Sequence, residues 1–251
     1  TFNQAAFVVG PALAGAISAI AGPGWVIGLD AASFAVLAVS CATAATGRRA
    51  TPAPAAPAAA GGWRTILAEP RLFGLTAVTC AFYLLYGPVE VALPIYVARD
   101  MAGSSALLGA YWTAFGVGAV VGGLGGGLLR NRRPFTVVIA IIVGWGAALL
   151  PIALTETVWF GLAGLAIGGL IYGPFTAICV ALFQQASPPH MLSRVLATRT
   201  ALTIPSAALG SLVGGPAVTA FGARPTMLAS ALLTIALGAV LAAASRLTSP
   251  A

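Results

Sequence analysis

The sequence predicts an all-α, polytopic membrane protein, and its composition is the first reason. Of the 251 residues, 59% are hydrophobic and only 7% are charged, and the mean hydropathy is +1.00. An ordinary soluble domain carries about a quarter of its residues as charged side chains. The apolar residues also fall into runs of about twenty, the length at which a helix crosses a ~30 Å hydrocarbon layer.

Eight such runs are expected to form transmembrane helices. They cover approximately residues 5–21, 25–45, 72–98, 106–129, 135–154, 158–183, 195–221 and 226–244. Because one long loop separates the second run from the third, three parts are expected: two helices in 1–45, a linker in 46–71, and a six-helix unit in 72–251. The chain enters an apolar run almost at once, without an initiator Met, as expected of the later part of a longer protein.

The long loop has a composition of its own. Arg48 and Arg49 are followed by Pro52, Pro54 and Pro57 among alanines, which favours an extended, semi-rigid tether. The segment 63–69 is then expected to form a short helix lying in the membrane interface, ended by Pro70.

The arginines predict the orientation of the chain. If the chain enters from the cytoplasm, ten arginines lie inside and two outside, which is a strong positive-inside bias. The inner set is Arg48, Arg49, Arg64, Arg71, the loop residues Arg130, Arg132 and Arg133, then Arg194, Arg199 and Arg246; the outer set is Arg99 and Arg224. Arg199 lies about one turn inside its span and is expected to snorkel to the inner surface. We therefore expect a protein of the cell membrane with both ends of the chain on the cytoplasmic side.

Little in the sequence supports an enzyme, a metal site or a cofactor. Cys41, Cys80 and Cys179 are isolated within apolar runs, and His190 is the single histidine. No nucleophile and base stand in a recognisable pair. No basic run interleaved with aromatic residues indicates nucleic-acid binding. The expected partners are the lipid bilayer and a small solute, with protons as a coupling ion.

The tripeptide Tyr-Gly-Pro occurs twice, each time in the middle of an apolar run, ending at Pro88 and at Pro174. Proline has no N–H, so these residues leave the carbonyls of Leu84 and Leu170 without their helical donor, and a helix break is expected at both places. Unpaired backbone inside lipid is tolerated only against protein or a water-filled cavity. Both segments are therefore expected to face inward.

Glu90 is the carboxylate deepest in any span, and it shares one helical face with Tyr83 and Tyr86. Placing that charge in a membrane costs about 2.5 to 3.5 kcal/mol on insertion scales. Two interpretations stand: a cavity-lining, protonatable carboxylate, or a hydrogen-bonded Glu that only joins helices. We expect Tyr83, Tyr86, Glu90 and Tyr172 to line a cavity for an amphipathic or cationic solute, with Glu90 as the proton-coupling residue. The aromatic residues could equally serve packing.

Other residues are expected to have structural roles. Small residues at intervals of four, such as Gly118 and Gly122, allow helices to approach closely. Asp30 is expected to bond to a neighbouring helix. Bends and close-packing points are expected at Gly10, Pro11, Gly15, Pro88, Pro94, Pro174, Gly215 and Pro216.

Two internal repeats are visible. Gly10-Pro11-Ala12 returns as Gly215-Pro216-Ala217 six spans later, in spans that run in the same direction. The two Tyr-Gly-Pro sites lie three spans apart, in spans that run in opposite directions. A parallel repeat with an inverted repeat nested inside it is the architecture of one class of transporters.

The chain resembles the major facilitator superfamily, in particular its drug and siderophore exporter branch of enterobactin-exporter-like and macrolide-efflux-like permeases. The resemblance rests on segments 10–15, similar to the "GP" motif of the fifth helix, and on 29–34, 63–72, 130–134 and 188–194. One departure is that no acidic residue precedes the basic cluster at Arg130.

The resemblance implies helices five to twelve of that fold: the last two helices of the first half and a complete six-helix second half. It also implies a secondary active transporter that works by alternating access and exports a drug or siderophore in exchange for protons. Export of this kind confers multidrug resistance. The alternative from another class is a non-transporting receptor or scaffold with the same helices.

Overall fold

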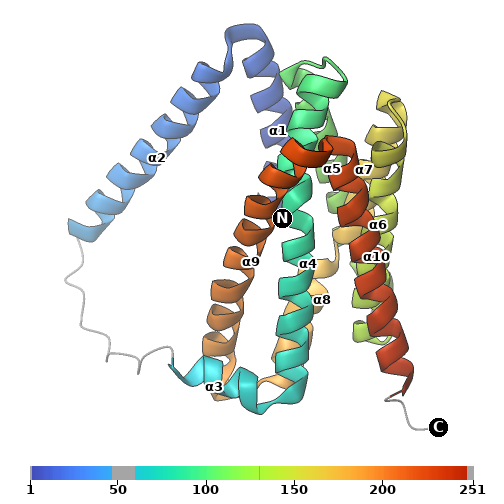
Figure 1. Ribbon diagram of the computed structural model, residues 1–251. Coiled ribbons are helices and arrows are strands. Elements are labelled where there is room, and N and C mark those ends of the chain that lie inside the picture. The colour runs from blue at the N-terminus through green and yellow to red at the C-terminus, as the bar shows by residue number, and fades with distance from the viewer. Residues whose placement is uncertain (1, 47–59, 130, 248–251) are drawn as a thin grey trace.

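The computed structural model describes residues 2–46, 60–129 and 131–247, and every regular element within them is helical (Figure 1). The elements are α1 (Phe2–Ala21), α2 (Pro23–Thr46), α3 (Ala60–Ala68), α4 (Pro70–Ile95), the π-helix η1 (Tyr96–Asp100), α5 (Ser105–Gly125), the 3-10 turn η2 (Gly126–Leu129), α6 (Pro134–Leu154), α7 (Val158–Tyr172), α8 (Phe175–Ala186), the 3-10 turn η3 (Pro189–Met191), α9 (Leu192–Phe221) and α10 (Ala223–Leu247). The prediction of an all-α protein is confirmed.

Seven helical stretches of the described chain are long and apolar enough to cross a membrane. They are Pro23–Ala44, Pro70–Asp100, Ser105–Leu129, Pro134–Leu154, Val158–Ala186, Pro189–Phe221 and Ala223–Ser245. Each matches one of the expected spans. The remaining expected span, 5–21, lies in α1, which packs along α5. Helix α2 contacts α1 and otherwise stands away from the bundle (Figure 1).

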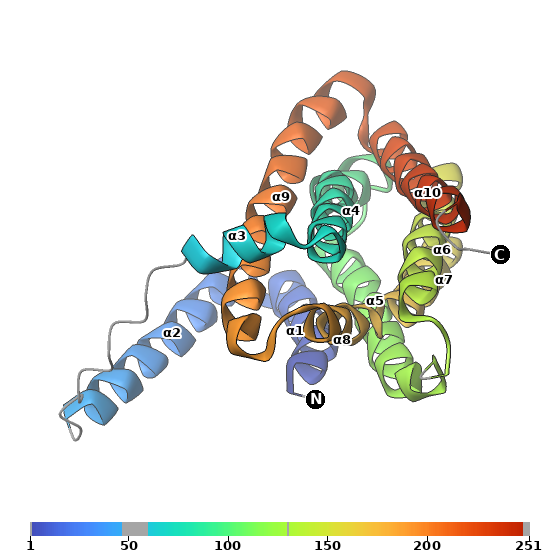
Figure 2. The same ribbon diagram turned by 90° about the horizontal axis from the view of Figure 1, so that it is seen from below.

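The six helical crossings from α4 to α10 pack in a pattern that repeats after inversion. Helix α4 packs closely with α9, and α7 packs closely with α5; α6 packs with α10; α6 contacts α7, and α10 contacts α4. Exchanging α4 with α7, α5 with α9 and α6 with α10 leaves this set of contacts unchanged. Figure 2 shows the resulting ring from the end that carries α3. The packing supports the inverted repeat that the two Tyr-Gly-Pro sites predict.

Two turns at the opposite end of the bundle are built alike. One residue, Gly22, joins α1 to α2 and has φ +90°, and Gly222 joins α9 to α10 with φ +91°. Each N–H donates to the carbonyl four residues earlier, at 3.1 Å for Gly22 and 2.9 Å for Gly222. Glycine ends a helix readily because it adopts positive φ without a steric cost. The likeness supports the parallel repeat.

The prolines of the two Tyr-Gly-Pro sites behave differently. The helix breaks at Gly173 and Pro174, between α7 and α8, as predicted. The predicted break at Pro88 is wrong, because α4 continues through Pro88 and Pro94 to Ile95. The Leu84 carbonyl, which has lost its donor, lies against the backbone of Gly210 on α9: a Cβ added to Gly210 would be 2.9 Å from the carbonyl carbon. A Cα–H group of a glycine can approach a carbonyl oxygen this closely and partly satisfy it.

Glycines line both close helix pairs. Between α4 and α9, a Cβ on Gly87 would lie 2.6 Å from the Ala207 oxygen, and one on Gly214 would lie 2.8 Å from Pro88 Cα. Between α5 and α7, Gly122 lies against Leu170, the residue whose carbonyl Pro174 leaves free. Both proline-freed carbonyls therefore face a glycine on the partner helix.

Some expected packing points fall elsewhere. Gly15 of α1 packs against α5, where an added Cβ would be 3.0 Å from Gly109 Cα. Nothing lies within 4 Å of a Cβ added to Gly10 or Gly215, so the expectation of close packing there is wrong. Within the stretch Gly214-Gly215-Pro216, where bends and close packing were expected, the close contact is made by Gly214. Helix α1 continues through Pro11, and α9 continues through Pro216.

The short helix α3 forms as predicted, and Pro70 begins the next helix. Trp63 and Leu67 are about half exposed, at 45% and 50%, while Ile66 is buried. Gly61 and Gly62 lie directly on Arg194 of α9, and Gly62 also on Thr198. Helix α3 is thereby fixed across the first turns of α9 (Figure 2). The predicted tether lies mostly in residues 47–59, outside the described part of the chain.

Candidate functional site

The structure brings together two of the predicted cavity residues from opposite repeats. Tyr83 of α4 and Tyr172 of α7 share a hydrogen bond between their hydroxyl oxygens, 3.1 Å apart. Tyr172 occupies the last turn of α7 because the glycine and proline that follow it end the helix. Its ring stacks on Phe175, the first residue of α8, with a centroid distance of 5.4 Å.

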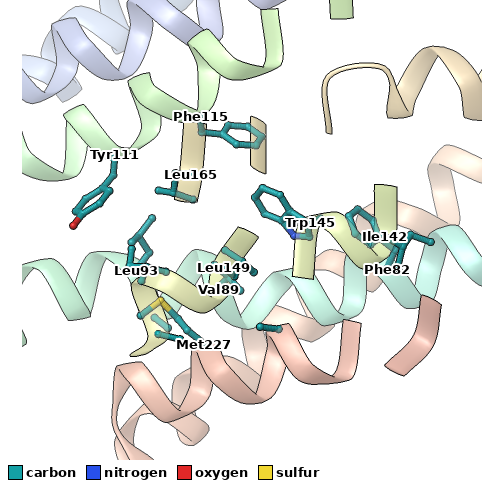
Figure 3. Packing of buried hydrophobic residues seen from close by; sticks show 14 of the residues in the cluster. Phe82, Val89, Leu93, Tyr111, Phe115, Ile142, Trp145, Leu149, Leu165 and Met227 are labelled. Carbon is teal, nitrogen blue, oxygen red and sulfur yellow. The ribbon is translucent and has the colours of Figure 1, made fainter. Parts of the chain in front are cut away.

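A set of aromatic residues that the sequence reasoning missed surrounds this tyrosine pair. Trp145 of α6 is buried, and its ring lies 6.0 Å from Tyr172 and 5.8 Å from Tyr86. Phe115 of α5 lies 5.4 Å from Trp145 (Figure 3). The indole Nε1 of Trp145 is enclosed and has no hydrogen-bond partner. The sequence position of Trp145 could have pointed to this role, because tryptophan usually lies at the ends of membrane spans and Trp145 lies in the middle of one.

Glu90 lies one turn beyond Tyr86 on α4 and is exposed. The hydroxyl of Ser211 on α9 lies 3.4 Å from Glu90 Oε2, where it can donate to the carboxylate. The same hydroxyl is 3.3 Å from the carbonyl oxygen of Gly87. Tyr86 lies one turn before Glu90 on the same face of α4. Ser211 is a further site residue that no sequence pattern pointed to.

Helical geometry places Glu90 relative to Tyr83 and to the end of its span. Seven residues separate it from Tyr83, so the two side chains share one face of α4. Tyr83 reaches Tyr172 of α7, whereas the carboxylate of Glu90 lies near Ser211 of α9. Glu90 lies ten residues before Asp100, which is about 15 Å from that end of the span. Of the two prolines, Pro174 is buried, and Pro88 packs on Gly214 of α9.

Other predicted residues lie apart from this group. Arg132 and Arg133 are exposed in the loop before α6, and Arg130 lies outside the described residues. Asp30 is exposed on α2, where its backbone carbonyl accepts a hydrogen bond of 2.7 Å from the Ser33 hydroxyl. The expected bond from its side chain to a neighbouring helix is not found among the described residues.

Arg199 does not snorkel as expected. Its side chain is only 9% exposed, and its guanidinium carbon lies 5.3 Å from the ring centre of Phe183 on α8. The Nε atom is enclosed and has no hydrogen-bond partner. The prediction failed because sequence position gives depth in the membrane, whereas burial depends on the helix packed alongside.

The other ionic contact of the described chain lies at the opposite end of the bundle from α3. Arg224, at the start of α10, donates to Glu156 in the α6–α7 loop at 2.7 Å and to the Ala153 carbonyl at 3.3 Å. This pair joins α6 to α10. Among the described residues, no three His, Cys, Asp or Glu side chains come together in a group suited to a metal ion.

Comparison with known proteins agrees with the helical architecture. Residues 1–204 match the sequence pattern of the Major Facilitator Superfamily. The chain is 28% identical over 231 residues to an uncharacterized MFS-type transporter, y4rN, of Sinorhizobium fredii, covering 84% of this chain and 54% of that protein. It is 29% identical over 245 residues to the multidrug efflux pump Tap of Mycobacterium tuberculosis, covering 94% of this chain and 58% of that protein.

The same figures hold for Tap of Mycobacterium bovis. The chain thus spans little more than half the length of these curated relatives. The matched region includes the α1–α2 hairpin, the tyrosine pair and Glu90, and it extends to within α9. The chain belongs to the major facilitator superfamily, whose members are multi-pass membrane transporters and not enzymes.

Proposed function

We propose that the full protein is a proton-coupled efflux transporter of a small organic solute, working by alternating access. Multidrug efflux by Tap is a property of that relative. For this chain, the observation that carries the proposal is the exposed carboxylate of Glu90, deep in a span and two helical turns beyond the tyrosine pair on the same face of α4. A charge so placed is costly unless it faces water or a ligand, so it is a functional residue by default.

The residues around Glu90 suit a cationic or amphipathic solute. The rings of Tyr83, Tyr86 and Tyr172 supply π faces, which attract organic cations. The carboxylate supplies a counter-charge that a proton can cancel. A proton arriving from one side would release a bound cation, and loss of that proton would restore binding, which is the exchange that an antiporter requires.

Ethidium accumulation in inverted membrane vesicles containing the full-length protein tests this function. An imposed proton gradient should drive ethidium into vesicles with the wild-type protein, and a protonophore should abolish it. Glu90→Gln should remove at least nine-tenths of the gradient-driven uptake, because the side chain can no longer exchange a proton. Glu156→Gln, which changes an exposed carboxylate outside the spans, is the matched control and should keep uptake. Unchanged uptake and unchanged pH dependence in Glu90→Gln would remove Glu90 from the coupling mechanism.

A further inference from the structure

The buried arginine Arg199 has five N–H donors, and the described part of the chain supplies no acceptor for any of them. No hydrogen bond or ion pair involves its guanidinium among the described residues, and the salt bridge found there joins Arg224 to Glu156. The contact that its guanidinium makes is with the ring of Phe183, 5.3 Å from the guanidinium carbon. An aromatic ring attracts the cation through its face but accepts none of the in-plane N–H groups.

The guanidinium is not sealed on every side. Only Nε is fully enclosed without a partner, whereas the two terminal nitrogens, which also lack hydrogen bonds, still reach open space. The guanidinium carbon lies over the ring of Phe183, a cation–π contact that favours this position of the side chain. A second enclosed and unpartnered polar atom, the Ser187 hydroxyl, lies just after α8, four residues from Phe183.

The position of Arg199 separates it from the Glu90 region. It lies seven residues into α9, about 10 Å from the end of the bundle that carries α3. Ser211, the α9 partner of Glu90, lies twelve residues further along, about 18 Å away. Arg199 and Glu90 therefore lie at different depths along the axis of the bundle.

We propose that Arg199 is a binding site for a carboxylate carried by a solute that enters from the α3 end. A carboxylate offers two oxygens at the spacing of the guanidinium fork, and the pair is strongest where water is scarce. The solute class follows: a zwitterion or other amphipathic solute whose anionic group is held at Arg199. This proposal rests on the proposed function in one respect, which is that the carboxylate belongs to a transported solute.

Thermal unfolding of the full-length protein in neutral detergent tests the site, with sodium benzoate as the probe against sodium chloride at equal ionic strength. Benzoate should raise the wild-type midpoint by about 2 to 4 °C at saturation. Arg199→Gln should abolish that rise. Arg199→Lys should keep part of it, since lysine retains the charge without the fork. Arg133→Gln, which changes an exposed loop arginine, should respond like the wild type.

Two results would overturn the proposal. One is that benzoate does not stabilise the wild type, or stabilises Arg199→Gln as much as the wild type. If Arg199→Gln does not fold, stabilisation of Arg199→Lys equal to that of the wild type would also overturn the proposal. The other is stabilisation by phosphatidylglycerol in nanodiscs, dependent on Arg199, without any effect of benzoate, which would assign the site to a lipid headgroup. Neither readout involves transport, so the site and the efflux function can fail independently.

Discussion

Replacing Gly210 by alanine should loosen the α4–α9 pair, because the new methyl group has no room. The added Cβ would lie 2.9 Å from the carbonyl carbon of Leu84 and 3.1 Å from Gly87 Cα. Both neighbours are backbone atoms, which cannot move aside as a side chain can. To restore ordinary contact, α9 would have to move away by roughly 1 Å, which weakens the dispersion contacts along the pair.

The size of the effect follows from two opposing contributions. Alanine in place of glycine stabilises a helix interior by up to about 1 kcal/mol. Overpacking of a close contact costs about 1 to 3 kcal/mol, and here the opposing atoms are rigid, so the cost should exceed the gain. A net loss of this order lowers the unfolding midpoint by roughly 2 to 8 °C.

The assay is thermal unfolding of the purified full-length protein, with Gly74→Ala as the control. Gly74 lies on α4, and nothing is within 4 Å of a Cβ added there, so this variant should be as stable as the wild type or slightly more stable. Gly122→Ala, at the equivalent place between α5 and α7, should behave like Gly210→Ala. If Gly210→Ala and Gly74→Ala unfolded at the same temperature, the close contact between α4 and α9 would be refuted.

Two further contacts at other places in the bundle can be tested by substitution. Tyr83→Phe and Tyr172→Phe should each lower the free energy of unfolding by about 0.5 to 1.5 kcal/mol, because each removes the same hydrogen bond. The double variant should therefore lose little more than either single variant. Additive losses in a thermal double-mutant cycle would contradict the shared bond. Arg224→Gln should cost no more than about 1 kcal/mol in the same assay, because its side chain is 29% exposed and that of Glu156 is 74% exposed. A loss of several kcal/mol would show that the pair is far less hydrated than described.

Much of the fold could be predicted because its determinants are local. Runs of apolar residues gave the spans, and the break after Tyr172 was correctly placed by its glycine and proline. The same reasoning failed at Pro88, where a neighbouring helix decides the outcome. Gly210 lies 122 residues further along the chain and accommodates the free carbonyl, so nothing near Pro88 in the sequence reveals that α4 continues.

The candidate site was predictable to a smaller extent. The expectation that Tyr83 faces Tyr172 agrees with the hydrogen bond between their hydroxyls, and a regular helix fixes which residues of α4 share the face of Tyr83. Ser211 and Trp145 were missed because their importance comes from which helices pack together. Arg199 was misjudged for the same reason, since α8 covers it. The cavity and coupling roles of the tyrosines and Glu90 remain predictions.

The contact between α3 and α9 has a mechanical consequence. Gly61 and Gly62 contact Arg194 and Thr198 of α9. The segment through which the chain enters the six-helix unit therefore packs directly on α9, its longest helix. A force applied at α3 would therefore act on α9 through this contact as well as on α4, the next helix along the chain. The entry to the six-helix unit is thus coupled to two helices that lie far apart in the sequence.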